Sequence, residues 1–237
     1  MFAVFVNMAT VLAGSILGLL LGSRFSPRTG STLMKCLGLC TLGIGFSSLL
    51  GTADTLCVII CMVIGTLLGE WVDIEKRMDA LGEVLRRKLI KGESGENRFV
   101  EGFVTATIVY CVGAMSINGS IAAGLNHDYS VIISKSVLDG VGAITFAATM
   151  GIGVAFSVVP ILLYQGGITL LAGVVGPYLP ASVITEMSAV GGAIIVGIGL
   201  NLLDLPREKL RVGNMLPAIF LPILYVPLSN ALSGLLG

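Results

Sequence analysis

Two residues of opposite charge, Lys135 and Asp139, stand four positions apart in a strongly apolar part of the chain. In an α-helix, side chains four residues apart lie on one face and can form an ion pair. Ionisable side chains inside a membrane-spanning helix are expensive to bury, so they mark candidate ion or solute pathways. Two interpretations stay open. In one, the pair lines such a pathway and Asp139 is the coordinating carboxylate; in the other, the pair only anchors one end of its helix.

Other polar residues lie within or near apolar stretches and are further candidates for the same pathway. Glu186 falls near the start of a later apolar stretch, where it could line the pathway or reach the outer lipid headgroups. The uncharged candidates could equally form hydrogen bonds between helices, each of which contributes about 0.6–2 kcal/mol. These uncharged candidates are Asn118, Ser120, Ser136, Gln165, Asn201 and Asn214.

The sequence contains no nucleophile elbow, phosphate-binding loop or zinc-protease motif, so we expect no catalytic residue, no cofactor and no metal site. Cys36 and Cys40 on one predicted helix, and Cys57 and Cys61 on the next, could suggest thiolate ligands for a soft metal. At 1.5 Å per residue, however, the two pairs differ in depth by about 10 Å, too far for four thiolates on one ion. We therefore predict that these cysteines are small packing residues.

The composition indicates that membrane-spanning helices position these residues. Of 237 residues, 55% are hydrophobic and only 12% are charged, and 14 basic residues balance 14 acidic ones. So few polar groups cannot cover a globular surface. The same numbers exclude a disordered chain, a disulfide-framed secreted domain and a nucleic-acid-binding protein. The sequence therefore predicts an all-α membrane helix bundle that forms a single domain, residues 1–237, in contact with lipid.

Apolar stretches of about 20 residues predict about seven or eight transmembrane helices. The fifth and sixth share one apolar run, which we divide at Pro160 because proline removes a helical hydrogen bond. The eighth contains Pro217, Pro222 and Pro227, so we expect it to be bent or re-entrant. A variant with fewer crossings would result if the fourth or eighth stretch dipped without crossing. The predicted spans are residues 4–22, 33–50, 55–71, 102–122, 134–157, 160–178, 183–203 and 213–235.

The basic residues predict the orientation of these spans. Residues 23–35, 72–101 and 204–212 together hold 13 of the 14 Lys and Arg residues, and the exception is Lys135. Because cytoplasmic loops carry an excess of Lys and Arg, this asymmetry predicts a cell-membrane protein with both termini outside. The polar stretch at 72–100 is predicted to form a cytoplasmic amphipathic helix followed by a loop.

Small residues at four-residue intervals predict where the helices touch. Lipid tails are as apolar as leucine, so helices in a membrane associate through close packing of small residues. Smooth faces of this kind also make a homo-oligomer plausible. In addition, Gly-Ile-Gly occurs at 43–45, 151–153 and 197–199, where glycines could break a helix, and the likeness of 42–45 to 150–153 suggests an inverted repeat. The predicted packing faces are Gly14, Gly18 and Gly22; Ala143, Ala147 and Gly151; and Ala189, Ala193 and Gly197.

Several stretches resemble a known bacterial family. They include Phe99-Val-Glu-Gly-Phe-Val-Thr-Ala-Thr107, Asn118-Gly-Ser120, Lys135-Ser-Val-Leu-Asp-Gly140, Tyr164-Gln-Gly166 and Asn214-Met-Leu-Pro217, together with Asn7, Gly14 and Gly18 nearer the amino terminus. Over essentially its whole length the chain resembles the family of domain of unknown function 554, the YqgA/YdfK-like proteins. The resemblance implies a multi-pass protein of the bacterial inner membrane, and members are often called transporters.

These observations leave two functions to weigh. The first is a transporter or channel for a small solute or ion, which the glycine-rich spans and the Lys135–Asp139 pair favour. The alternative is a non-transporting scaffold or regulatory protein that acts through the predicted helix at 71–90. An enzyme is not expected, because the sequence brings no base, nucleophile and metal ligands together.

Overall fold

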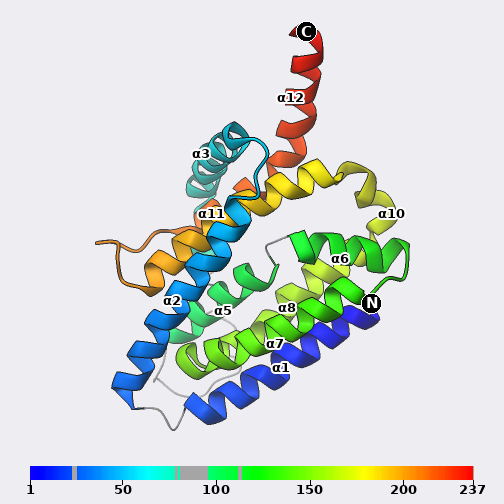
Figure 1. The fold of residues 1–237 in the computed structure, drawn as a ribbon. Coiled ribbons are helices and arrows are strands. Elements are labelled where there is room, and N and C mark those ends of the chain that lie inside the picture. Colours follow the sequence, from blue (N-terminus) through cyan, green and yellow to red (C-terminus); the bar gives the residue numbers. More distant parts are fainter. Residues whose placement is uncertain (23–25, 78–79, 81–95, 112–113, 237) are drawn as a thin grey trace.

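The computed structural model describes residues 1–22, 26–77, 80, 96–111 and 114–236. Within these ranges every regular element is a helix (Figure 1), which confirms the predicted all-α membrane bundle. The long helices are α1 (Phe2–Gly22), α2 (Pro27–Leu49), α3 (Thr55–Val72), α5 (Glu96–Cys111), α6 (Ala114–Leu125), α7 (Ser130–Met150), α11 (Ala181–Leu202) and α12 (Pro222–Leu236). The shorter ones are η1 (Ile152–Ser157), α8 (Val158–Ile161), η2 (Leu162–Gly166), α9 (Gly167–Leu170), α10 (Ala172–Val175), η3 (Gly176–Tyr178) and η4 (Val212–Phe220).

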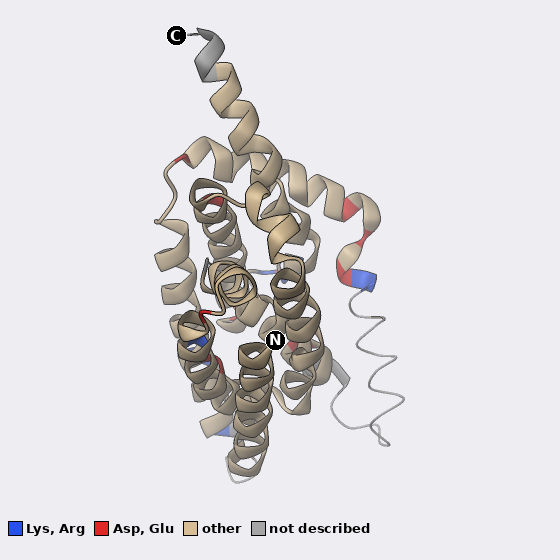
Figure 2. Ribbon diagram, turned by 90° about the vertical axis from the view of Figure 1, so that its right-hand side faces the viewer, with Lys and Arg blue, Asp and Glu red and all other residues tan. Residues whose placement is uncertain are grey.

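The number of crossings agrees with the expectation. In the described part of the chain, 6 helices are long and apolar enough to cross a membrane, and two bent pairs raise the number to 8. The pair α5–α6 is bent by 59° and the pair η4–α12 by 45°, and these are the fourth and eighth predicted spans. After its bend, α12 extends away from the other helices (Figures 1 and 2).

Contacts at both ends of the sixth span (152–170) show that the bent fourth span also crosses the bundle. Gly153 packs against Phe99 near the start of α5, and Gly124 near the end of α6 packs against Thr169. The two segments therefore run parallel, side by side, over their full lengths. The fourth span therefore covers the same depth of the bundle as the sixth, which favours a crossing over the variant in which it only dips.

Polar contacts gather the connections at two opposite ends of the bundle. At one end, which we call the inner end, Lys209 forms an ion pair with Glu101, with 2.9 Å between Nζ and Oε1. At the other, the outer end, Glu186 accepts a hydrogen bond of 2.6 Å from the Thr52 hydroxyl in the loop between α2 and α3. Between the ends most of the ribbon carries no charge (Figure 2). Helices that cross a membrane in alternating directions place their connecting loops at two opposite ends in this way.

The tightest helix contact joins α1 to α7, which run parallel. A Cβ atom at Gly14 would lie 2.2 Å from the carbonyl oxygen of Gly140, and one at Gly18 would lie 2.2 Å from that of Ile144. One turn further on, Gly22 meets the carbonyl of Ala148 in the same way. The glycine face of α1 is thus occupied by a contact within the chain.

The boundary between the fifth and sixth spans lies at Gly151, so the predicted division at Pro160 is wrong. Helix α7 ends at Met150, and Gly151 has a φ of 84° that a residue with a side chain rarely adopts. Pro160 lies instead in the four-residue helix α8, inside the sixth span. It follows the 3-10 segment η1, where the backbone already departs from a regular α-helix, and the sixth span continues through it without a break. Gly151 therefore ends α7 and is not part of its packing face.

Helix α11 packs against α2 through glycines other than those predicted. The two helices are antiparallel, and a Cβ atom at Gly192 would lie 2.7 Å from the carbonyl oxygen of Gly45. Two turns further along α11, Gly199 packs against Leu42, which lies about one turn before Gly45 on α2. The predicted face is turned elsewhere: Ala189 is fully buried in the core, and Gly197 lies against Val212.

The suggested inverted repeat gains no support from the backbone. Residues 43–45 lie inside the unbroken helix α2, and 197–199 lie inside α11, whereas 151–153 follow the end of α7. The two similar segments are therefore not in equivalent structural positions. The predicted amphipathic helix at 71–90 is described only in part. After α3 the backbone becomes left-handed at Asp73 and helical again at 74–77, and residues 78–79 and 81–95 lie outside the described ranges.

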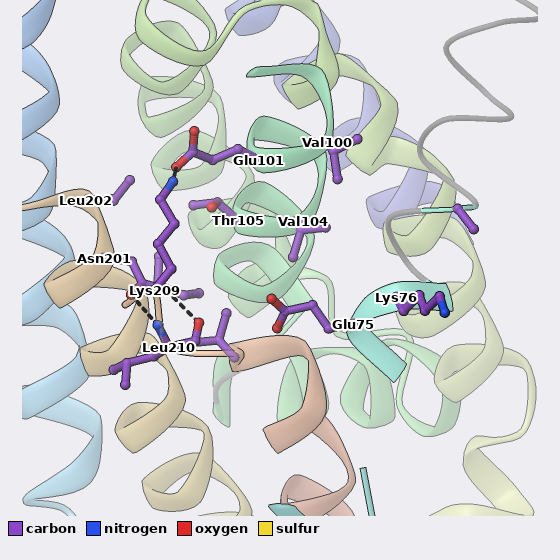
Figure 3. A pocket seen from close by; sticks show the side chains of 13 residues that line it. Glu75, Lys76, Val100, Glu101, Val104, Thr105, Asn201, Leu202, Lys209 and Leu210 are labelled. Carbon is purple, nitrogen blue, oxygen red and sulfur yellow. Dashed lines mark hydrogen bonds and ion pairs between the residues drawn. The ribbon is translucent and has the colours of Figure 1, made fainter. Parts of the chain in front are cut away.

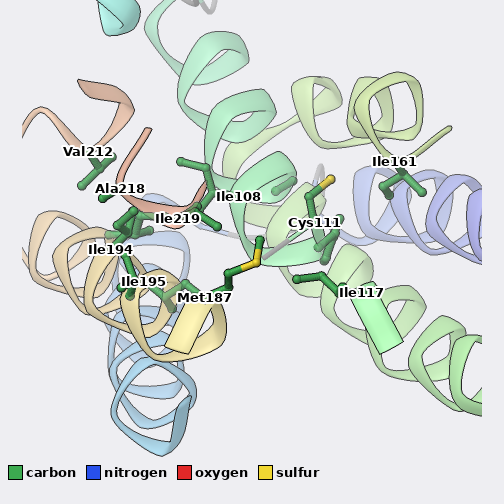
Figure 4. Close-up of a cluster of buried hydrophobic side chains, with 14 of the residues drawn as sticks. Ile108, Cys111, Ile117, Ile161, Met187, Ile194, Ile195, Val212, Ala218 and Ile219 are labelled. Atoms are coloured by element: carbon green, nitrogen blue, oxygen red, sulfur yellow. The ribbon is translucent and has the colours of Figure 1, made fainter. Parts of the chain in front are cut away.

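The helices form two groups. The first bundle comprises α1, α5, α6, α7 and residues 152–170; the second bundle comprises α2, α3, α11, η4 and α12. Buried side chains join them (Figure 4): Ile108 and Ile117 of the first bundle face Met187, Ile194 and neighbouring residues of the second. Within the second bundle, α3 meets η4 at Gly65 and Gly69, as close packing of small residues in membranes requires.

The α1–α7 contact leads to a prediction for Gly18→Leu. The added side chain would force the two helices apart, so we expect a loss of about 1–3 kcal/mol and a lower thermal unfolding midpoint in detergent. The matched control is Gly43→Leu, since a Cβ atom at this exposed glycine meets nothing within 4 Å. Equal losses in both variants would contradict this account of the contact.

Candidate functional site

Lys135 and Asp139 form an ion pair inside the first bundle. Both lie on α7, and their side chains are only 7% and 8% exposed. Lys135 Nζ donates to Asp139 Oδ2 across one helical turn, as their spacing predicts. The Lys135 ammonium also lies 5.9 Å from the centre of the Tyr110 ring, within the range of a cation–π interaction. The pair therefore does not lie at a solvated helix end.

Hydrogen bonds extend from this ion pair across four further helical segments. Asn7 Nδ2 on α1 donates to Asp139 Oδ2 at 3.1 Å and to Gln165 Oε1 at 3.1 Å. Gln165 Nε2 in turn donates to Ser116 Oγ on α6 at 3.3 Å, and the Ser116 hydroxyl donates to the Tyr110 carbonyl at 2.9 Å. We call the six residues Asn7, Tyr110, Ser116, Lys135, Asp139 and Gln165 the buried polar cluster.

Irregular backbone brings these groups together. Gln165 lies in η2, a π-helical turn, and such turns are rare and frequently found at functional sites. The described parts of α5 and α6 meet at a bend of 59°. Beside this bend, the Tyr110 carbonyl accepts its hydrogen bond from the Ser116 hydroxyl. A straight fourth span and an α-helical sixth span would not present these groups to α7.

The cluster is incompletely satisfied. Among the described residues, neither Asn7 Oδ1 nor the Tyr110 hydroxyl has a hydrogen-bond partner, although both side chains are at most 1% exposed. Leaving a buried polar atom unpaired costs about 1–3 kcal/mol. Native structures keep such atoms rarely, and each requires an explanation.

Of the residues that the sequence suggested, the structure joins Lys135, Asp139 and Gln165. Ser136 is buried beside them, but its hydroxyl donates to the Ile132 carbonyl of its own helix at 2.7 Å. The hydroxyl of Ser120 is buried and has no partner among the described residues, and Asn118 is exposed. Neither Ser120 nor Asn118 has a hydrogen bond to the cluster.

Glu186 holds the outer loop between α2 and α3. Its carboxylate accepts hydrogen bonds from the Thr52 hydroxyl and from the backbone N–H groups of Ala53 at 2.8 Å and Asp54 at 3.2 Å. Asp54 then caps α3 by accepting from the backbone N–H of Leu56. Glu186 therefore ties α11 to the start of α3, and its partners account for a buried carboxylate.

Asn201 and Asn214 hold connections at the inner end. Asn201 donates to the Leu210 carbonyl at 2.9 Å and accepts from the Leu210 N–H at 2.8 Å, which closes the loop after α11. Asn214 accepts from the backbone N–H of Glu75 at 2.7 Å and donates to Glu70 Oε1 at 2.8 Å. Both amides belong to the framework rather than to the cluster.

Sequence reasoning did not assign Asn7, Ser116 or Tyr110 to the site. Asn7 carried a usable signal, because it is an amide inside a long apolar stretch and one of the residues of the family resemblance. Ser116 and Tyr110 carried none, since a serine in a helix usually bonds its own backbone and a tyrosine commonly packs in a core.

Two cavities lined by described residues lie along the seam between the bundles. The larger, of about 730 Å³, opens at the inner end, where the Lys209–Glu101 ion pair lies at its wall (Figure 3). Its lining includes Lys76, Thr105, Ile198 and Asn201. The smaller, of about 290 Å³, is apolar and lies between α6, α9, α11 and η4. Neither cavity reaches Lys135 or Asp139.

Comparison with known proteins establishes the family. The profile of the family described as "Protein of unknown function (DUF554)" matches residues 2–227. The chain belongs to this family. A relative named "Uncharacterized membrane protein YdfK", from Bacillus subtilis (strain 168), is 29% identical over 226 residues, which cover 94% of each chain.

A second relative, "Uncharacterized protein YqgA" from Escherichia coli (strain K12), is 31% identical over 230 residues, which cover 96% of this chain and 95% of YqgA. No solved structure matches the chain. Together with the apolar helices, the family confirms the resemblance inferred from the sequence and a membrane location.

The ion pair predicts a strong coupling between its two partners. Lys135→Met or Asp139→Asn alone leaves one buried charge uncompensated, so we expect each to lower stability by about 3–5 kcal/mol in sodium-free buffer. The double variant should recover most of this loss. The comparison pair, Lys209→Met and Glu101→Gln, removes an exposed ion pair worth about 0–1 kcal/mol. Additive losses at 135 and 139, measured by thermal unfolding in detergent, would show that the pair is not coupled.

Proposed function

We propose that this protein is a membrane transporter for a small solute or ion, and that the buried polar cluster is the site on which transport depends. The observation that carries this proposal is the burial of Lys135 and Asp139 beside the 59° bend between α5 and α6 and the π-helical turn of the sixth span. A buried ion pair is weak evidence for a stabilising role, because apolar replacements are often at least as stable. Discontinuous helices around ionisable groups are typical of transporters.

The arrangement of the two bundles supports a mechanism of alternating access. The cluster lies wholly within the first bundle, whereas both cavities lie on the seam with the second. Along α5, about 7.5 Å separate Thr105, which lines the inner cavity, from Tyr110 in the cluster. Buried side chains such as Ile108 and Ile194 fill the space between the bundles there (Figure 4). A shift of one bundle against the other would open a route from the inner cavity to the cluster.

The scaffold alternative receives no comparable support. It depends on the predicted helix at 71–90, of which residues 78–79 and 81–90 lie outside the described ranges. The described start of that segment, 74–77, lies at the wall of the inner cavity through Glu75 and Lys76. Its position beside a candidate entrance fits a transporter.

We also propose that the protein lies in the bacterial cytoplasmic membrane with both termini outside. The inner end of the bundle gathers the contacts of residues 70–76 with 211–214, and the segments around them carry most of the basic residues. At the opposite end, the ring of Phe2 lies 5.9 Å from that of Tyr129. The positive-inside rule then places the inner end in the cytoplasm.

Reporter fusions test this orientation. Alkaline phosphatase, which folds only outside the cytoplasm, should be active when fused after Gly237 and inactive when inserted at 91–95. A fluorescent protein that fails to mature after export should show the reverse pattern. Active phosphatase at 91–95 would invert the proposed topology without affecting the assignment of the site.

Transport is tested with purified protein in liposomes. Solid-supported-membrane electrophysiology and an internal pH dye would follow concentration jumps of alkali cations, amino acids and short-chain organic acids. We expect at least one of these to produce a flux, and the double variant Lys135→Met/Asp139→Asn to lower that flux about tenfold or more, since both charges of the site are gone.

The double variant is preferred because it leaves no unpaired charge to unfold the protein. Glu101→Gln, which changes the exposed inner ion pair, is the matched control and should retain most of the flux. Full flux in the double variant, or no flux of any compound in the wild-type protein, would contradict the proposed function.

A further inference from the structure

We infer that the buried polar cluster is a binding site for a sodium ion, which replaces the Lys135 ammonium beside Asp139. This inference deepens the proposed function, because it names the species that the transport site holds. It rests on the oxygen atoms around Asp139, on two that lack partners, on the backbone of α5 and on the charge balance of the cluster.

Oxygen atoms dominate the cluster, and hard cations prefer oxygen ligands. Besides the Asp139 carboxylate, they are the amide oxygens of Asn7 and Gln165, the Ser116 hydroxyl, and the carbonyl and hydroxyl of Tyr110. Hydrogen bonds of 2.9–3.3 Å link Asn7, Gln165, Ser116 and the Tyr110 carbonyl in one continuous chain that begins at Asp139. Five helical segments supply these atoms, so a cation bound beside Asp139 would connect helices that are distant in the sequence.

Two oxygen atoms of the cluster have no hydrogen-bond partner among the described residues and are free to ligate a cation. Asn7 is fully buried, and its Nδ2 atom donates to two acceptors, Asp139 Oδ2 and Gln165 Oε1, which fixes the orientation of the amide. Its Oδ1 atom is then left without a donor. The Tyr110 hydroxyl is also unpartnered and lies near Gly142, one turn beyond Asp139 on α7. A bound cation satisfies such oxygens without a hydrogen-bond donor.

The backbone adds to the preference for positive charge. The Tyr110 carbonyl lies in the last described turn of α5, beside the 59° bend between α5 and α6, and points along α5 toward the end that carries partial negative charge. Carboxyl ends of half-helices and unwound carbonyls are the groups that hold sodium ions in other transporters. The face of the Tyr110 ring also attracts a cation. In the present conformation the Lys135 ammonium receives this attraction.

Charge balance selects a monovalent ion. Asp139 contributes one negative charge and Lys135 one positive charge, so the buried cluster is neutral as it stands. A monovalent cation can replace the ammonium one for one, whereas a divalent cation would leave a net charge in a medium of low dielectric constant. Lys135 lies one turn nearer the outer end of α7, and its flexible stem lets the ammonium move toward the outer headgroups.

Thermal unfolding of the full-length protein in detergent tests this inference. Sodium, potassium and choline chlorides are compared at one ionic strength, at neutral pH and again at low pH. Lys135→Met removes the competing ammonium, so we expect sodium chloride to raise its unfolding midpoint by about 5 °C or more over choline chloride. The sodium concentration for half the effect should be about tenfold lower than in the wild-type protein. Lys135→Met/Asp139→Asn should show no sodium effect, and Lys209→Met should behave like the wild type.

Three results would overturn the inference. They are stabilisation of Lys135→Met by low pH but not by sodium, equal stabilisation by potassium, and no response to either ion. If Lys135→Met does not fold, direct binding of radioactive sodium to the wild-type protein replaces this test. We expect Asn7→Ala to weaken that binding about tenfold, and wild-type protein that binds no sodium would also overturn the inference. Binding is measured without transport: sodium binding without flux contradicts only the proposed function, and flux without sodium binding contradicts only this inference.

Discussion

The close approach of α1 to α7 is the constraint on which the rest of the structure depends. At Gly14, Gly18 and Gly22 the two backbones touch, because lipid provides no hydrophobic force that would hold larger side chains together there. This contact fixes the rotation and depth of α1, and two turns before Gly14 it places Asn7 against Asp139. A backbone contact along the middle of two helices thus determines the geometry of a polar group near their ends.

The polar groups of this protein separate into two kinds. Glu186, Asn201 and Asn214 bond the backbone of neighbouring loops and keep the ends of the spans in place. The cluster around Asp139 instead consists of side chains that bond mainly one another, and two of its atoms are unpaired. These loop contacts all hold the second bundle together, whereas the incompletely satisfied cluster lies inside the first bundle, where its side chains can exchange partners.

The sequence was sufficient for features that depend on local spacing. Runs of apolar residues predicted the spans, and four-residue spacing predicted the Lys135–Asp139 ion pair. It was insufficient where the outcome depends on which surfaces meet. Asn7 and Gln165 are 158 positions apart and meet only because α1 packs on α7 and the sixth span contains a π-helical turn. The division at Pro160 failed because the irregular sixth span continues through this proline, whereas the chain turns at Gly151, whose positive φ a sequence pattern does not reveal.

The π-helical turn at Leu162–Gly166 has a consequence for how the family can change in length. Such a turn holds one residue more than an α-helical turn. Deleting a single residue there would leave a continuous, equally apolar helix, yet would rotate one half of it against the other by about 100°. Gln165 could then no longer meet Asn7 and Ser116 while Gly153 stayed against Phe99. Insertions and deletions should therefore accumulate in the loops of relatives and be absent from this span, however little its composition distinguishes it from the others.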